Sequence, residues 1–173
     1  DPDKLAKEEY IVLPGVGSFS AGMEALGKRS LDDAIHSAAS RGAKILGICL
    51  GMQLLGAWGE EGKGVNGLNL ISNNVMKFKE EEVGNNKIPH VGFNSVEFSS
   101  DKGLFKGFGE NADFYFTHSF RMNSDNLHAN HGMCRYGNEF LAAFEHENVC
   151  GTQFHPEKSQ TNGLVLLRNF LEN

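Results

Sequence analysis

One cysteine stands in a sequence context that is typical of a catalytic nucleophile. Cys49 is the centre of a Gly-Ile-Cys-Leu-Gly pentapeptide, between an apolar run that predicts a strand and a segment that predicts a helix. Glycines on both sides permit the sharp, strained turn of a nucleophile elbow. We expect this thiol to be exposed at the head of the helix, whose positive end favours the thiolate. The alternative is a buried structural thiol, the commoner fate of cysteine in a protein core.

A histidine and a glutamate far downstream complete a candidate triad. His155 and Glu157 are separated by one residue, so their side chains lie on the same face of an extended segment. The Glu157 carboxylate can then orient the imidazole, and the imidazole can take the proton of Cys49. The sequence therefore predicts a Cys-His-Glu site that attacks a carbonyl carbon. A histidine that merely ends a strand is the alternative for His155.

Acyl transfer also needs hydrogen-bond donors for the developing oxyanion. The backbone amide of Leu50, directly after the nucleophile, is one candidate. A second donor can come from residues 14–17, a Pro-Gly-Val-Gly loop at the end of a neighbouring strand. A plain tight turn is the alternative for this loop.

Length, charge and cysteine count exclude several other classes of protein. The chain has 173 residues, enough for one domain with a three-layer core. The net charge is −6 and no long uncharged apolar run occurs, so nucleic-acid binding and membrane insertion are disfavoured. Three irregularly spaced cysteines indicate free thiols in a reducing cytoplasm rather than a disulfide framework. Without CxxC or HExxH motifs, we expect neither a metal nor a cofactor.

Hydrophobic periodicity predicts two strand–helix units in the first third of the chain. Residues 10–13 and 43–48 are short apolar runs typical of buried parallel strands. Residues 30–42 have helical spacing, with Ser30 as the expected N-cap, and residues 50–58 predict a second helix. This order implies a right-handed crossover, with ligands at the carboxyl edge of the sheet. We therefore expect an α/β fold with three layers and a doubly wound, mostly parallel sheet.

The remainder of the chain reads as further strands and one helix. Residues 75–78, 91–98 and 114–120 predict strands between polar loops, and residues 140–154 predict a hairpin. A single apolar stripe then predicts a C-terminal helix, with Asn162 as its cap. No repeat or domain boundary interrupts the chain.

Four blocks of sequence resemble the class I (triad-type) glutamine amidotransferases. They are residues 13–19 (LPGVGSF), 47–53 (GICLGMQ), 115–120 (YFTHSF) and 153–159 (QFHPEKS). Two further stretches are similar to the glutaminase subunits of imidazole glycerol-phosphate synthase, the HisH family: residues 89–94 (PHVGFN) and the chain end from Asn162 to Leu171. The resemblance runs over essentially the whole chain and implies a flavodoxin-like fold.

The resemblance also implies a role for each matching residue. Cys49 would form a glutamyl thioester, with His155 as acid and base and Glu157 as its orienting partner. The amides of Val16 and Leu50 would form the oxyanion hole, that of Val16 after a peptide flip triggered by the partner. The residues that would hold the glutamine α-groups are Gly15, Gly17, Gln53, Ser119 and Phe120. Those at the partner interface would be Phe93, Asn94 and Lys158.

The implied reaction needs a second protein. In this family L-glutamine is hydrolysed to glutamate and ammonia. The ammonia passes to a (β/α)8-barrel cyclase subunit, HisF-like, within a heterodimer that works in histidine biosynthesis. There it reacts with a phosphoribulosyl formimino intermediate. The resemblance thus implies a cytoplasmic glutaminase whose product is delivered to a partner.

Two departures from the family pattern lead to further expectations. Family members begin with a strand, a Tyr-Gly-x-Gly-Asn-like turn and a helix, and none of these precedes Asp1. We therefore expect residues 1–173 to be a single amidotransferase domain that lacks its N-terminal strand–helix unit. Phe93 stands where HisH proteins commonly have tryptophan. This keeps open, as an alternative, a HisH-like paralogue that delivers ammonia to a partner in bacterial surface-sugar synthesis.

The sequence is also compatible with two other functions. A stand-alone γ-glutamyl hydrolase has the same elbow architecture and needs no partner that accepts ammonia. A non-catalytic interaction module would keep the fold alone.

Overall fold

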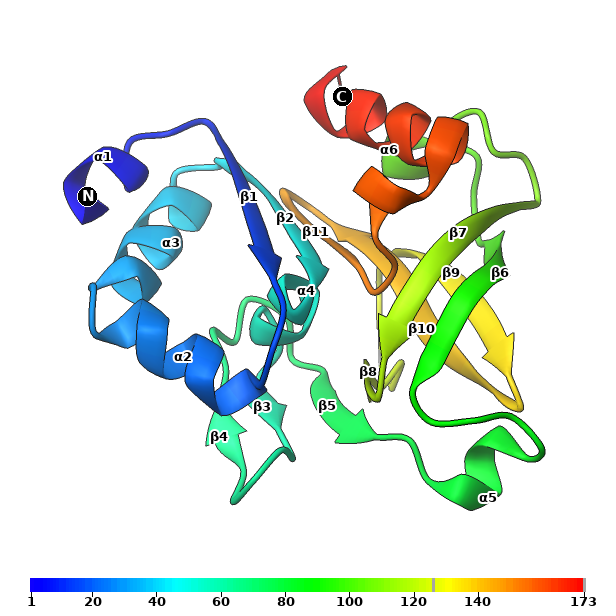
Figure 1. Ribbon diagram of the computed structural model, residues 1–173. Coiled ribbons are helices and arrows are strands. Elements are labelled where there is room, and N and C mark those ends of the chain that lie inside the picture. The colour runs from blue at the N-terminus through cyan, green and yellow to red at the C-terminus, as the bar shows by residue number, and fades with distance from the viewer. Residues whose placement is uncertain (126, 173) are drawn as a thin grey trace.

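A seven-stranded sheet forms the centre of the molecule in the computed structural model, which describes residues 1–125 and 127–172 (Figure 1). The strand order is β1-β2-β11-β10-β9-β6-β7. The strands are β1 (Tyr10–Gly15), β2 (Lys44–Cys49), β6 (His90–Phe98), β7 (Asn111–His118), β9 (Asn130–Tyr136), β10 (Asn138–His146) and β11 (Val149–Thr152).

Parallel pairing is confined to one end of this sheet. Strand β2 lies between β1 and β11 and is parallel to both. The pairs β11–β10, β10–β9, β9–β6 and β6–β7 are antiparallel. Short hairpin connections such as Glu147-Asn148 between β10 and β11 reverse the chain, and a parallel pair cannot be joined so tightly. The α/β fold is confirmed, but the sheet is mixed rather than mostly parallel.

A second, smaller sheet lies beside the first. Its order is β4-β3-β5-β8. Its members are β3 (Trp58–Gly59), β4 (Val65–Asn66), β5 (Asn74–Lys77) and β8 (Phe120–Met122). The single strand predicted over residues 114–120 is therefore wrong, because the chain leaves one sheet after His118 and enters the other at Phe120. The break at Ser119 places this junction at the mouth of the site described below.

Helices cover both faces of the main sheet, which confirms the three layers (Figure 1). On one side lie α1 (Pro2–Leu5), α2 (Phe19–Gly27), α3 (Leu31–Ser40) and α4 (Leu50–Leu54). On the other lies α6 (Gln160–Glu172). Three short turns complete the chain: α5 (Glu80–Val83), η1 (Gly103–Phe105) and η2 (Pro156–Lys158).

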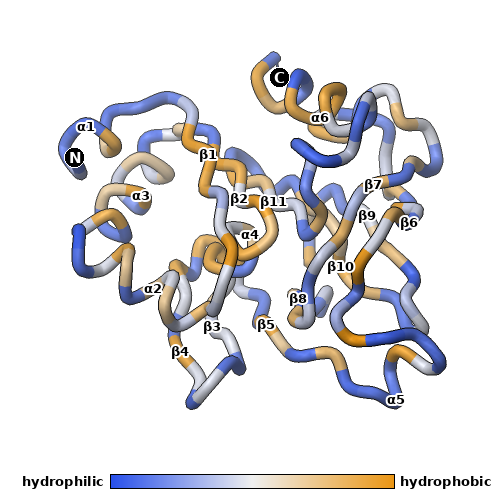
Figure 2. Tube along the Cα trace, in the orientation of Figure 1, coloured by the Kyte–Doolittle hydropathy of each residue, from blue (hydrophilic) through white to orange (hydrophobic). Residues whose placement is uncertain are grey.

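Strand β2 carries both apolar cores. Its residues are buried from Ile45 to Cys49. Because side chains alternate along a strand, Ile45 packs in the core under α2 and α3, and Leu46 packs in the core under α6. Figure 2 shows apolar residues gathered along β1 and β2. Burial on both faces explains why this strand reads as a continuous apolar run.

The structure confirms the position of one predicted cap, without its side-chain hydrogen bond, and corrects two other local expectations. Ser30 occupies the N-cap of α3, but it has φ 52° and its side chain makes no capping hydrogen bond. Asn162 lies inside α6, where its Nδ2 donates to the carbonyl of Asp113 at 3.0 Å rather than capping the helix. The helix predicted over residues 50–58 ends at Leu54, because the chain turns into β3 at Trp58. Helix α2 and strand β9 were not predicted.

Close packing fixes α4 against β1 and β2. A side chain at Gly51 would overlap the carbonyl oxygen of Leu13 in β1. A Cβ atom at Gly47 would lie 2.6 Å from the backbone nitrogen of Met52. Both contacts are backbone to backbone, so neither can relax by a change of rotamer. The two glycines therefore allow the helix to begin directly at the end of the strand.

We expect Gly51→Ala to lower the free energy of unfolding by about 3 kcal/mol or more, because the new methyl group forces α4 away from β1. Urea denaturation measures this change. Gly27→Ala is the matched control. A Cβ atom there meets only Asp32 Oδ2 at 3.7 Å, so alanine is tolerated at the end of α2. Equal stability of the two variants would contradict the packing argument.

Candidate active site

The backbone at Cys49 is held in a strained conformation between β2 and α4. Its φ of 54° and ψ of −110° lie where residues with a side chain rarely occur. Strand β1 runs parallel to β2 with Gly15 opposite Cys49. The loop that follows β1 therefore lies directly beside the elbow, as the sequence predicted.

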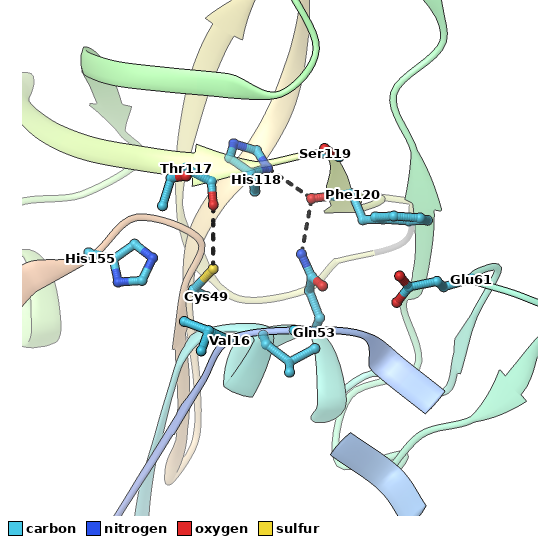
Figure 3. Close-up of a pocket in the computed structure, with 11 residues that line it drawn as sticks. Val16, Cys49, Gln53, Glu61, Thr117, His118, Ser119, Phe120 and His155 are labelled. Carbon is cyan, nitrogen blue, oxygen red and sulfur yellow. Dashed lines mark hydrogen bonds between the residues drawn. The ribbon is translucent and has the colours of Figure 1, made fainter. Parts of the chain in front are cut away.

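A cavity of about 210 Å³ opens over the thiol (Figure 3). Four segments meet there: the loop after β1, the elbow with α4, the junction between β7 and β8, and the segment that follows β11. Most of the predicted site residues line this cavity. Its full lining is Val16, Gly17, Cys49, Leu50, Gln53, Glu61, Thr117, His118, Ser119, Phe120 and His155.

His155 is oriented by Glu157. The imidazole Nδ1 donates to Glu157 Oε1 at 2.7 Å. The other ring nitrogen, Nε2, is buried and has no hydrogen-bond partner among the described residues. Figure 3 shows the ring beside Cys49 on the cavity wall. This nitrogen is therefore available to take a proton from a neighbouring group.

The loop that carries His155 is tied to β7. The backbone N–H of His155 donates to the carbonyl of Tyr115 at 2.9 Å. Ser159 Oγ donates to the carbonyl of His155 at 2.6 Å and accepts from the Tyr115 amide at 2.9 Å. These bonds fix the height of the imidazole above the sheet edge.

The Cys49 thiol is buried, contrary to the expected exposed thiolate. Only 7% of the residue is exposed, and burial raises the pKa of the thiol to about 11. The amide of Leu50 hydrogen-bonds the sulfur and opposes this shift of the pKa, but α4 has only five residues and a correspondingly small dipole. The thiol is therefore protonated at neutral pH, and its activation needs a base.

A pair of buried histidines supports the junction between β7 and β8. His118 Nδ1 lies 2.8 Å from the carbonyl of Phe120, and His118 Nε2 lies 3.1 Å from His90 Nδ1. A carbonyl only accepts, so His118 carries its proton on Nδ1 and accepts at Nε2 from His90. Burial lowers the pKa of His90 to about 4 and that of His118 to about 3. Two neutral rings thus hold the Phe120 carbonyl in place.

Glu61 also belongs to the site, although the sequence analysis did not predict it as a site residue. Its side chain lines the cavity, and Oε2 accepts from the backbone N–H of Phe19 at 2.5 Å, at the start of α2. Figure 3 places it across the cavity from His155. A carboxylate in this position can bind a cationic group of a small ligand. The acidic pair at positions 60 and 61, soon after the elbow, was the available signal.

Two of the three predicted interface residues share an exposed patch. Phe93 is 51% exposed and packs edge-on against Tyr115, with ring centroids 5.5 Å apart. Lys158 Nζ lies 5.9 Å from the centroid of the same Tyr115 ring. Asn94 turns to the neighbouring strand instead, where its Nδ2 donates to the carbonyl of Arg135 at 3.1 Å. Phe93, Tyr115 and Lys158, here called the aromatic patch, lie beside the loop that carries His155.

Two further features concern the described residues as a whole. None of their helices is both long and apolar enough to cross a bilayer. Nor do three or more of their His, Cys, Asp or Glu side chains converge as a metal site would require.

Comparison with known proteins places the chain in a family. The model of the family "Glutamine amidotransferase class-I" matches residues 2–173. The imidazole glycerol phosphate synthase subunit HisH of Methanocaldococcus jannaschii is 43% identical over 170 residues, which cover 98% of this chain and 83% of that protein. The HisH subunit of Moorella thermoacetica is 40% identical over 172 residues, with 99% and 80% covered. The chain therefore belongs to the class I glutamine amidotransferases and, within them, to the HisH family.

Solved structures of low sequence identity share the fold. The glutaminase domain of CTPS from Trypanosoma brucei, solved with bound acivicin, has a TM-score of 0.67 at 15% identity, over 99% of this chain and 74% of that one. The PurLQS structure from Thermotoga maritima has a TM-score of 0.67 at 22% identity, over 94% and 78%. The fold expected from the sequence is thus found in proteins of low sequence identity to this chain.

The histidine pair predicts a pH-dependent stability. Both rings have a pKa near 6.5 in the unfolded chain and lower values, about 4 and 3, in the folded chain. Between these values the unfolded state binds more protons, so the free energy of unfolding falls as the pH is lowered from 6.5 to 4. We expect His90→Asn, which keeps a donor near the Nδ1 position, to reduce this slope in urea denaturation. Exposed His36→Asn is the control, and an unchanged slope in His90→Asn would contradict the assignment.

Proposed function

We propose that this protein is the glutaminase subunit of an imidazole glycerol-phosphate synthase. It hydrolyses L-glutamine to glutamate and ammonia and supplies the ammonia to a cyclase subunit in histidine biosynthesis. The observation that carries the proposal is the cavity in which a strained elbow cysteine lies beside His155, whose Nδ1 is held by Glu157. Membership of the HisH family selects glutamine among the carbonyl compounds that such a site can attack.

The first half of the reaction forms a thioester. Cys49 Sγ attacks the side-chain carbonyl carbon of glutamine while His155 Nε2 takes the thiol proton. Glu157 stabilises the imidazolium through Nδ1. The tetrahedral intermediate collapses when His155 returns the proton to the leaving nitrogen. Ammonia departs, and the glutamyl group remains on Cys49.

The second half regenerates the enzyme. Water attacks the thioester carbon, with His155 Nε2 now acting as the base for the water proton. Glutamate leaves, and the sulfur recovers its proton from the imidazolium. In both halves the amide of Leu50 is one donor to the oxyanion. The amide of Val16 is the second donor after its loop, where Val16 is 83% exposed, rearranges.

Substrate binding uses the groups that face the thiol. Glu61 binds the α-ammonium group of glutamine, because it is the carboxylate that lines the cavity. Gln53 adds an acceptor for the same group. Backbone groups of Gly17 and of the junction at Ser119 and Phe120 bind the α-carboxylate. Gly15 has a supporting role, since a larger residue there would press on Leu50, whose Cβ lies 3.2 Å from the added carbon.

The partner is a HisF-like cyclase subunit with a (β/α)8 barrel, bound as a heterodimer. The aromatic patch supports this proposal, because it combines an exposed aromatic ring with Lys158 directly beside the catalytic loop. A partner seated there, and contacting Asn94 at the margin, would receive ammonia before bulk water protonates it. We further propose that residues 1–173 fold as one amidotransferase domain in the cytoplasm.

Ammonia release from glutamine tests the proposal, with and without an added HisF-like cyclase. We expect Cys49→Ala to reduce the rate by more than about 1,000-fold, because no other described thiol lines the cavity. Glu61→Gln is the contrast variant. It should raise the KM about tenfold through loss of the ammonium contact, and change kcat less.

Two outcomes would overturn parts of this account. Release by Cys49→Ala at the wild-type rate would refute the mechanism. A rate that added cyclase leaves unchanged would refute the histidine-pathway partner. It would favour a paralogue of surface-sugar synthesis or a stand-alone γ-glutamyl hydrolase instead.

A further inference from the structure

We infer that Gln153 is a further catalytic residue, whose side-chain amide donates a hydrogen bond to the Cys49 sulfur and stabilises the thiolate formed during attack. The inference rests on the proposed function, since it concerns the nucleophile of that reaction. It assigns a chemical role to a residue two positions before His155. Gln153 contacts the sulfur but is not among the residues that line the cavity.

The contact between the two side chains is direct. Gln153 Nε2 lies 3.7 Å from Cys49 Sγ, a normal distance for an N–H···S hydrogen bond. Gln153 is fully buried, and its backbone N–H donates to the carbonyl of Ala142 at 2.8 Å. The side chain therefore reaches the sulfur from a fixed point beyond the end of β11.

A chain of hydrogen bonds determines which end of the Gln153 amide faces the sulfur. Gln53 Nε2 donates to the carbonyl of Phe120 at 3.0 Å, and this carbonyl can only accept. The same nitrogen donates its second hydrogen to Gln153 Oε1 at 2.9 Å. The oxygen of Gln153 is thus engaged by Gln53, and its NH₂ group is directed at Cys49. An amide flip would place donor against donor and oxygen against sulfur.

The other contacts of the sulfur do not provide this stabilisation throughout the reaction. The neutral thiol donates to the carbonyl of Thr117 at 3.9 Å, and that acceptor becomes unfavourable once the proton has left. The Leu50 amide also contacts the sulfur, but the mechanism assigns it to the oxyanion. Gln153 remains a donor to sulfur in every step. A hydrogen bond to a charged group is roughly twice as strong as one between neutral groups.

Several charged or titratable groups act on the same sulfur. The Glu157 carboxylate raises the pKa of Cys49, whereas the Lys158 ammonium lowers it. His155, Glu61 and His118 line the same cavity. Gln153 is neutral, so its effect does not vary with its own protonation. A variant at this position therefore changes the Cys49 titration without adding a new titrating group.

Alkylation of Cys49 by iodoacetamide tests the inference, since the thiolate displaces iodide and no glutamine is needed. The rate is followed from pH 7 to pH 10, below the pKa of Cys49 of about 11, where it is proportional to the fraction of thiolate. Mass spectrometry of the Cys49 peptide separates this residue from Cys134 and Cys150. Gln153→Met keeps the side-chain length and removes the donor. We expect alkylation about tenfold slower at each pH in this range, because loss of the hydrogen bond leaves a smaller fraction of the thiol ionised. Gln160→Met, on the exposed start of α6, is the control and should match wild type.

An unchanged rate of alkylation in folded Gln153→Met would overturn the inference. Circular dichroism establishes whether that variant is folded. If it is not, NMR of the wild-type protein gives the answer. The side-chain amide protons of Gln153, assigned through the backbone, should shift as Cys49 ionises at alkaline pH and stay constant in Cys49→Ser. Amide protons that do not follow the thiol would equally overturn it.

These readouts separate the two proposals. Wild-type protein that releases no ammonia, with the Gln153 effect intact, would refute the glutaminase and leave the thiol chemistry standing. Normal glutaminase activity with no Gln153 effect would refute only the role of Gln153.

Discussion

The site depends on how closely α4 packs against β1 and β2. There is no space for a side chain at Gly51 beside the carbonyl of Leu13, or at Gly47 beside the backbone of Met52. This contact forces the chain from strand to helix within one residue, and Cys49 takes the left-handed φ of 54° that such a turn requires. The parallel register then sets Gly15 opposite Cys49. One packing constraint thus positions the nucleophile and its neighbouring loop together.

The same constraint gives the sulfur its chemistry. Because the thiol is buried at the edge of the sheet, it is shielded from water, and this desolvation raises the pKa of Cys49 to about 11. Activation must therefore come from fixed neighbours: the unpaired Nε2 of His155, the Leu50 amide and the Gln153 amide. Glu157 and the hydrogen bonds of Ser159 hold His155 in position. The Phe120 carbonyl orients Gln53, which in turn orients the Gln153 amide. The groups around the sulfur are therefore in place before any ligand enters, whereas the loop at Val16 still has to rearrange.

Local spacing was sufficient to predict the parts of the site that lie close together in sequence. The elbow around Cys49, the pairing of His155 with Glu157 and the adjacent loop after β1 all follow from short motifs. Strand β2 was evident from its apolar run, because both of its faces are buried. The order of elements predicted the α/β class, and the resemblance predicted the amidotransferase fold.

The features that were missed depend on long-range contacts or on burial. His90 and His118 are 28 positions apart, and Gln153 and Cys49 are 104 apart, so no spacing rule connects them. The prediction that Cys49 is exposed was wrong, because its burial depends on the close packing of α4 against β1, and tertiary packing cannot be seen in local sequence. The hairpin of β10 and β11 was predicted, but the antiparallel pairing around β9 was missed, because the apolar alternation of this strand is weak and its partners β6 and β10 are set by tertiary structure.

The central claim is that Cys49 Sγ is the nucleophile that attacks the side-chain carbonyl carbon of glutamine. A glutamine analogue with a diazoketone in place of the amide alkylates whichever nucleophile occupies that position. Peptide mass spectrometry after incubation locates the modified residue. The account predicts modification of Cys49 alone, with protection by added glutamine. Modification of Cys134 or Cys150, or labelling of Cys49 that glutamine does not slow, would contradict it.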